Sequence, residues 1–168
     1  MSDHSMRHAK HERGASLLVA LIFLVIMAML GVTVANVTGL QERMAGNTRN
    51  RDLALQAAEA AVRDAETRLS NAAFRAGASA YDVSKANSST YWETCFTATT
   101  PAAPCDAKQT PTQSLPMTGP GAVAAQPQFV LERKPDSGST QIYRITARAV
   151  GGTTDSVVIV QAEFGYTP

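Results

Sequence analysis

The chain has 168 residues, 45% of them hydrophobic, and a formal net charge of +1 at pH 7. This length predicts one domain, or one domain with an anchor, and the near-zero charge gives no reason to expect nucleic acid as a partner. All three histidines (His4, His8 and His11) precede residue 15, so removal of that stretch would leave twelve basic residues, twelve acidic residues and no histidine. Because histidine is the usual general base and the commonest metal ligand, we expect no enzyme, cofactor, metal site or small-molecule substrate.

The first predicted element is an apolar helix that begins directly after Gly14. Residues 15–37 carry no charge, and their 23 helical positions at about 1.5 Å each span roughly 35 Å, enough to cross a hydrocarbon core of about 30 Å. The alternatives are an ordinary signal anchor and a buried core helix, and the length disfavours the second. We therefore assign residues 15–38 to a membrane-spanning helix.

Residues 1–14 are predicted to be a leader that is removed. A secretory signal peptide is cut after its apolar core at a small-residue site, and Ala28 and Gly31 make a poor site of that kind. Gly14 instead lies before the core. Cleavage after Gly14 would leave the apolar helix on the mature chain, with a new charged amine on Ala15.

An amphipathic helix is predicted to continue through residues 39–75. Apolar residues recur there at spacings of three and four, and they form a stripe that we expect to pack against a sheet: Leu55, Ala58, Val62, Ala65 and Leu69. Gly39 and Gly46 each cost about 1 kcal/mol relative to alanine in a helix interior. The sequence therefore leaves open whether the helix is continuous or breaks at a turn over residues 45–47.

Residues 76–126 form a region of weaker periodicity that is rich in Ser, Thr, Pro, Gly and Ala. Residues 88–90 and 97–104 are predicted as loops, and the aromatic side chains at positions 91, 92 and 96 as contacts that hold the region against the domain. Long loops in a compact domain usually carry variable surface or function, so a surface-binding role is open.

Cys95 and Cys105 are the two cysteines of the chain. An even pair in an exported domain predicts a disulfide, and the mature chain has no histidine or further cysteine to complete a metal site with them. Their separation predicts a stabilisation of roughly 2–3 kcal/mol. Basic residues flank both ends of the apolar helix and do not decide its orientation, but the cysteine pair and the length of the C-terminal part favour a C-terminal domain outside the cytoplasm.

Residues 127–168 carry the strand signals. Residues 129–133 are a short candidate, residues 142–150 alternate between two faces, and residues 157–164 form a further apolar run after a hairpin connection at residues 151–154. Together with the preceding helix, these strands predict an α+β fold in which a long helix packs on a small antiparallel sheet of three or four strands.

Several segments resemble one known family. Arg13-Gly14 and residues 15–19 (ASLLV), followed by the apolar helix, resemble the class III signal of type IV prepilins. Residues 41–47 (QERMAGN) and 51–60 (RDLALQAAEA) resemble the N-terminal region of PilX-type minor pilins. The segment YRITAR, which begins at Tyr143, and the final Val-rich strand are similar to their C-terminal end. The resemblance covers both ends of the chain strongly and the middle poorly.

This resemblance implies a type IV pilin-like fold and a non-enzymatic structural subunit. A prepilin peptidase would cut between Gly14 and Ala15 on the cytoplasmic side and methylate the Ala15 amine. The apolar helix would lie in the inner membrane, with the C-terminal domain in the periplasm, and would then move into the filament core. The partners that the resemblance implies are other minor pilins, the major pilin, the peptidase and inner-membrane lipid.

Two residues depart from the pattern of the major pilins. Ala15 stands where phenylalanine is usual, and Val19 stands where glutamate is usual. In major pilins that glutamate is thought to pair with the amine of a neighbouring subunit, because a carboxylate in an apolar core is costly unless paired. Val19 permits no such pairing. We therefore expect a subunit at or near the pilus tip, in a minor-pilin complex that primes assembly.

Other functions remain open at this point. The first is a minor pseudopilin of a type II secretion system, although the pseudopilin known to lack the glutamate is considerably larger. The second is a bitopic inner-membrane protein with a periplasmic adhesive or sensory domain. The third is a membrane-tethered enzyme, for which the sequence offers no nucleophile–base pair, phosphate loop or metal cluster.

Overall fold

The computed structural model describes residues 12–168, and the side chains from Ala15 onward. Most of the expected leader, including its three histidines, lies outside the described residues. The chain divides into two units, Met1–Gly46 and Asn47–Pro168, which we describe separately.

Helix α1 comprises Glu12–Arg68, 57 residues in all. The turn considered at residues 45–47 does not form, and both Gly39 and Gly46 have helical conformation. After Arg68 the chain turns, and Asn71 begins the short helix α2 (Ala72–Ala76) by accepting a hydrogen bond from the Ala73 amide. Because this cap starts a new helix, the helix expected over residues 39–75 is in fact two helices.

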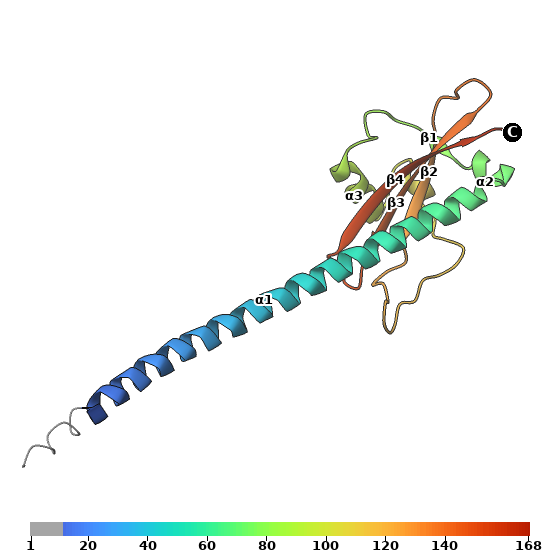
Figure 1. The fold of residues 1–168 in the computed structure, drawn as a ribbon. Helices are drawn as coiled ribbons and strands as arrows, with labels where there is room; N and C mark the ends of the chain where they lie inside the picture. Colours follow the sequence, from blue (N-terminus) through green and yellow to red (C-terminus); the bar gives the residue numbers. More distant parts are fainter. Residues whose placement is uncertain (1–11) are drawn as a thin grey trace, which may run out of the picture. The chain divides into compact units, whose positions relative to one another are not determined.

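Four strands form one sheet in the order β1-β2-β3-β4 (Figure 1). Their bounds are β1 Ser79–Ala80, β2 Gln128–Arg133, β3 Gln141–Val150 and β4 Val157–Tyr166. Strands β2, β3 and β4 are antiparallel neighbours, and they coincide with the three predicted strands to within two residues at each end. Strand β1, which the sequence analysis missed, is parallel to β2 and two residues long.

The end of α1 packs on one face of this sheet. Ala61, Val62 and Ala65 of the helix, with Leu69 directly after it, form one core with strand residues whose side chains all point to that face: Phe129, Leu131, Tyr143, Ile145 and Ala147. The small alanine side chains let the helix approach the sheet closely. The predicted α+β class, with a long helix on a mostly antiparallel sheet, is confirmed.

One member of the predicted stripe is corrected by the structure. Ala58, Val62, Ala65 and Leu69 are buried, but Leu55 is 40% exposed. The buried stripe instead continues toward the N-terminus through Ala54, Ala57 and Ala61. The hydrophobic pattern misled because leucine is the more apolar residue, whereas the close packing on the sheet favours alanine.

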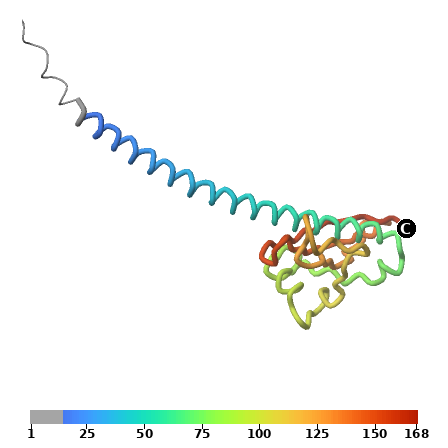
Figure 2. Tube along the Cα trace, turned by 90° about the horizontal axis from the view of Figure 1, so that it is seen from below, coloured from blue at the N-terminus to red at the C-terminus, as the bar shows by residue number. Residues whose placement is uncertain are grey.

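The opposite face of the sheet is covered by helix α3 (Ser89–Thr97), the 3-10 helix η1 (Cys105–Ala107) and their connecting loops (Figure 2). Residues 88–90 are therefore not a loop: the Ser88 side chain caps α3 by accepting a hydrogen bond from the Tyr91 amide. Trp92 and Phe96 are buried against Val130 of β2, as the sequence predicted for the aromatic residues of this region.

Candidate functional site

The apolar half of α1 is the largest exposed hydrophobic surface in the described chain. Every residue from Ala15 to Arg49 is exposed within the chain, including Leu17 at 73% and Met27 at 71%. By length and composition α1 is able to cross a membrane. Soluble monomers rarely leave so much contiguous apolar surface uncovered, so this surface requires lipid or other apolar helices around it.

Two threonine hydroxyls within this segment bond to their own helix. Thr33 donates to the carbonyl of Met29 at 2.9 Å, and Thr38 donates to the carbonyl of Val34 at 3.0 Å. A hydroxyl satisfied in this way adds little cost in an apolar environment, because no unpaired donor remains. These two threonines are thus compatible with an apolar surrounding.

The predicted cleavage position lies at the beginning of α1. Gly14 is helical, and Ala15 is the first residue whose side chain is described. Val19 lies four residues further, is 50% exposed and belongs to the same apolar surface. No charged residue occurs between Ala15 and Gln41. Cleavage after Gly14 would therefore place the new amine of Ala15 on a helix end that offers no carboxylate of its own within seven turns of helix.

The two cysteines are joined by a disulfide between α3 and η1. Cys95 and Cys105 have Cα atoms 5.6 Å apart, and Cys105 is completely buried. The bridge lies in the same core as Trp92 and Phe96. It thus fixes the layer that covers the second face of the sheet.

Ion pairs connect this layer to the strands. Arg148 of β3 donates two hydrogen bonds to the carboxylate of Glu93 of α3, at 2.7 and 3.1 Å. Glu132 of β2 and Arg144 of β3 are 1% and 3% exposed and form a two-bonded pair at 2.6 and 2.9 Å. Burial raises the pKa of the Glu132 carboxyl, and the guanidinium of Arg144 opposes that shift.

The sequence analysis missed the Glu132–Arg144 pair. Both residues lie on strands at positions that periodicity alone assigns to a solvent face. The signal appears only when the strands are aligned, because Glu132 and Arg144 are then direct cross-strand partners. The layer of α3 makes that face an interior one.

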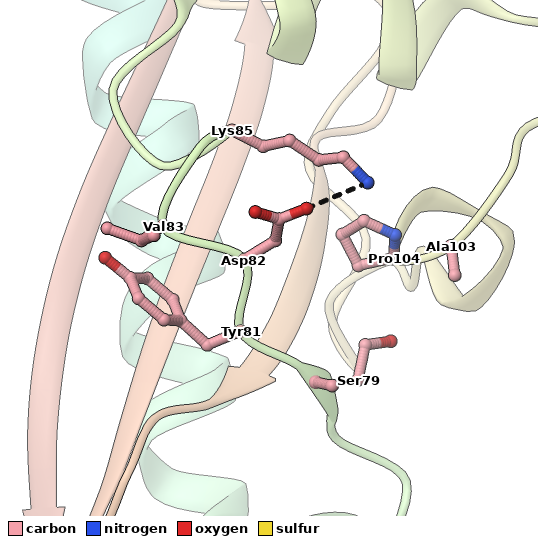
Figure 3. A pocket seen from close by; sticks show the side chains of 8 residues that line it. Ser79, Tyr81, Asp82, Val83, Lys85, Ala103 and Pro104 are labelled. Carbon is pink, nitrogen blue, oxygen red and sulfur yellow. Dashed lines mark ion pairs between the residues drawn. The ribbon is translucent and has the colours of Figure 1, made fainter.

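A shallow pocket of about 470 Å³ opens beside β1 (Figure 3). Its lining includes Tyr81, Asp82, Lys85 and Pro104, and Asp82 and Lys85 pair with each other at 3.2 Å. The amide and the hydroxyl of Ser84 both donate hydrogen bonds to the Asp82 carboxylate. These bonds lower the pKa of the Asp82 carboxyl. Asp82 and Lys85 thus form an ion pair with each other, and this pair stabilises the turn over residues 81–85.

Within residues 12–168 no three His, Cys, Asp or Glu side chains cluster in a way that could hold a metal ion. The prominent features of the described chain are an exposed apolar helix and a disulfide-bonded layer on the sheet.

Two family models match the chain, and together they cover almost all of it. The model described as PilX N-terminal matches residues 13–63, and the model described as type IV pilus assembly protein PilX C-term matches residues 63–165. Comparison with curated proteins and comparison with solved structures gave no match.

Proposed function

Since the chain belongs to the PilX family of type IV pilus assembly proteins, a family of structural minor pilins, we propose that it is a non-enzymatic subunit of a tip-associated minor-pilin complex that primes pilus assembly. The proposal adds to the family assignment a position in the filament, a processing site and a set of partners. Each of these has its own support in the chain.

The observation that carries the proposal is the uninterrupted apolar surface of α1 from Ala15 onward, with Val19 at its fifth position. A subunit in the body of a filament has a neighbour on each side along the axis, so its fifth-position carboxylate can pair with a neighbouring amine. A subunit that begins the filament needs no such pair. Because burying an unpaired carboxylate is costly, valine suits a position where no amine is offered.

We infer processing after Gly14 and methylation of Ala15 from the resemblance of residues 13–19 to the class III signal of type IV prepilins. Removal of residues 1–14 would bring the charged end of the chain to the edge of the apolar helix. The helix would stay in the inner membrane until assembly. Lipid and the apolar helices of other pilins are chemically equivalent surroundings for such a surface, so the same helix serves both states.

A periplasmic location of the C-terminal domain is supported by the Cys95–Cys105 disulfide, because such bonds persist in oxidising compartments. The expected partners are the other minor pilins, the major pilin and the prepilin peptidase. The family match favours the pilus over a type II secretion system.

The proposal is tested by complementing a deletion of the gene with the parent chain, with Val19→Glu and with the matched control Val19→Leu. The number of pili per cell and the amount of this subunit per pilus are measured. We expect few pili in the deletion, few copies of the subunit per pilus, parent behaviour for Val19→Leu and reduced priming for Val19→Glu. Parent-like piliation with Val19→Glu, or a copy number near that of the major pilin, would contradict the tip position.

A further inference from the structure

Strand β4 forms one edge of the sheet, and it is long, regular and uncharged for most of its length. It pairs with β3 at all ten positions from Val157 to Tyr166, without a bulge. It contains no proline, and Glu163 is its single charged residue. Soluble proteins usually protect such an edge, because its unpaired amides and carbonyls are a template for another strand.

The opposite edge of the same sheet is protected in that way. Strand β1 has only two residues, and the chain after it folds over: the Tyr81 amide donates to the Arg133 carbonyl at 3.1 Å, and the Tyr81 ring lies under Arg144 and Lys134. Beside β4 there is no equivalent. Among the described residues, no backbone hydrogen bond other than those to β3 involves residues 157–166.

The side chains of β4 are also incompletely covered. Those that point toward α1 are only half-buried: Val158, Val160, Ala162, Phe164 and Tyr166. The β3 partners of the first four are buried, and Gln141, the partner of Tyr166, is half-buried. An edge strand is normally less buried than its inner neighbour, and a further strand beside β4 would cover this row.

The flank of α1 beyond β4 presents matching chemistry. On the other flank, Asp64 and Arg68 bind the 109–112 segment, which borders β2. Helical periodicity therefore directs Leu55 toward the β4 side, and Glu66 lies further round that same flank. This explains why Leu55, exposed at 40%, lies outside the buried stripe. Val62, on the same flank, is already buried in the core, and Glu59 pairs with Arg63 at 3.5 Å.

From this edge we propose that β4 binds an extended segment of another protein, which adds to the sheet as a fifth strand. The segment has apolar side chains at alternate positions, which lie next to the half-buried row of β4 and to Leu55. It also has a basic residue that pairs with Glu66. In such strand addition the main-chain hydrogen bonds supply affinity and the alternate side chains supply specificity. The proposal depends on the sheet edge alone and holds for a tip or a shaft subunit.

The direction of the elements argues against one arrangement of a second copy, a two-fold dimer through antiparallel β4 strands. Along one core, Ala57 and Ala58 lie against Val158, and Arg75 lies 3.8 Å from the ring centroid of Tyr166, so the end of α1 and β4 run in the same direction. A two-fold dimer with antiparallel β4 strands would reverse this direction in the partner. In such a dimer the ends of the two α1 helices that pack on the sheets would run in opposite directions.

The test is site-specific photo-crosslinking of the full-length chain in cells that assemble it. The crosslinker is placed at Leu55, on the α1 side of the edge, and at Gln161, on the other face of β4; Val83, 77% exposed beside the protected edge, is the control. We expect Leu55 and Gln161 to give products with one and the same short segment of a partner, mapped by mass spectrometry, and Val83 to give none. Products from separate segments, products with β4 of a second copy, or no product above the Val83 level would overturn the proposal.

A pair of proline variants tests whether backbone pairing is responsible. Successive amides of a strand point to opposite edges, so either Gln161→Pro or Ala162→Pro removes a bond to β3 and the other removes only an outward donor. In the variant that keeps the parent Tm, we expect the yield of the crosslinked product from Leu55 to fall about tenfold. In the control Gln161→Ala, we expect that yield to stay at the parent level. A folded proline variant with an undiminished product would overturn the proposal, and the crosslink map alone decides if neither proline variant folds.

Discussion

Glu132 and Arg144 lie directly opposite each other on β2 and β3, and their ion pair is almost completely buried beneath the layer of α3. The guanidinium of Arg144 also lies 4.4 Å from the ring centroid of Tyr81 and 5.5 Å from that of Trp92. One arginine therefore connects the sheet, the turn after β1 and the helix α3. The side chains of Glu132, Tyr81 and Trp92, which lie on the second face of the sheet, all contact this guanidinium.

Replacing Arg144 is expected to be strongly destabilising. Arg144→Met keeps the length of the side chain but leaves Glu132 buried without its partner, which costs on the order of 3–5 kcal/mol. Denaturant unfolding of the full chain in detergent measures the loss. The control is Arg133→Met, because the ion pair of Arg133 with Asp136 is half-exposed and worth at most about 1 kcal/mol. Equal effects of the two variants would contradict this assignment.

The pH dependence of stability has a sign set by Glu132. Its carboxyl pKa is raised in the folded chain, so the contribution of this group is fully present below its unfolded pKa and is lost as the pH rises through its folded pKa. Relative to Glu132→Gln, the parent should therefore lose stability as the pH rises from acid to neutral. Tm measured across this range checks the slope.

Asp82 supplies the control with the opposite sign. Its pKa is lowered, chiefly by the Ser84 hydroxyl, so its contribution is present above its unfolded pKa and is lost as the pH falls through its folded pKa. Asp82→Asn should accordingly change the slope in the other direction, by a smaller amount because the group is exposed. The same sign for both variants would show that another group dominates.

The disulfide is expected to hold the α3 layer on the sheet. Replacing both cysteines, as Cys95→Ser with Cys105→Ser, should lower the free energy of unfolding by roughly 2–3 kcal/mol for a loop of this length. The double variant avoids a free thiol. Reduction of the parent chain should have the same effect, and it should leave the double variant unchanged. A parent chain that is insensitive to reductant would contradict this prediction.

A close backbone approach makes Gly151 sensitive to substitution. A Cβ atom at this position would overlap the carbonyl oxygen of Asn50 on α1, which is backbone and cannot rotate away. Gly151→Ala should therefore separate the β3–β4 turn from the helix and lower Tm. Gly46→Ala is the matched control: nothing lies near that position, and alanine should favour the helix by about 1 kcal/mol. A neutral Gly151→Ala would contradict the close approach.

The main features of the fold could be predicted from local pattern. The uncharged run from Ala15 onward specifies its own helix, and the alternation around Ile145 identifies a strand whose two faces differ. Both signals depend only on near neighbours in the sequence. For the same reason the predicted strands β2, β3 and β4 agree closely with the structure.

The features that were missed depend on distant neighbours. Helix α3 lies in a region whose Ser and Thr content is typical of loops. Ser88 caps this helix, but the helix is stabilised by the burial of Trp92 and Phe96 against the sheet, which the local sequence does not reveal. Leu55 lies on the flank of α1 rather than on the face that meets the sheet, and only the tertiary packing decides which face that is. The Glu132–Arg144 pair requires the register of two strands, which no local period supplies.

The central claim concerns where the mature chain begins and what then surrounds its apolar helix. The most direct measurement is the intact mass, with N-terminal sequencing, of the full-length protein extracted from the membranes of the cells that make it. A minor pilin of this kind should begin at an N-methylated Ala15 and retain the whole apolar segment of α1. A chain that keeps its first 14 residues, or one that is cut after the apolar segment, would contradict the assignment.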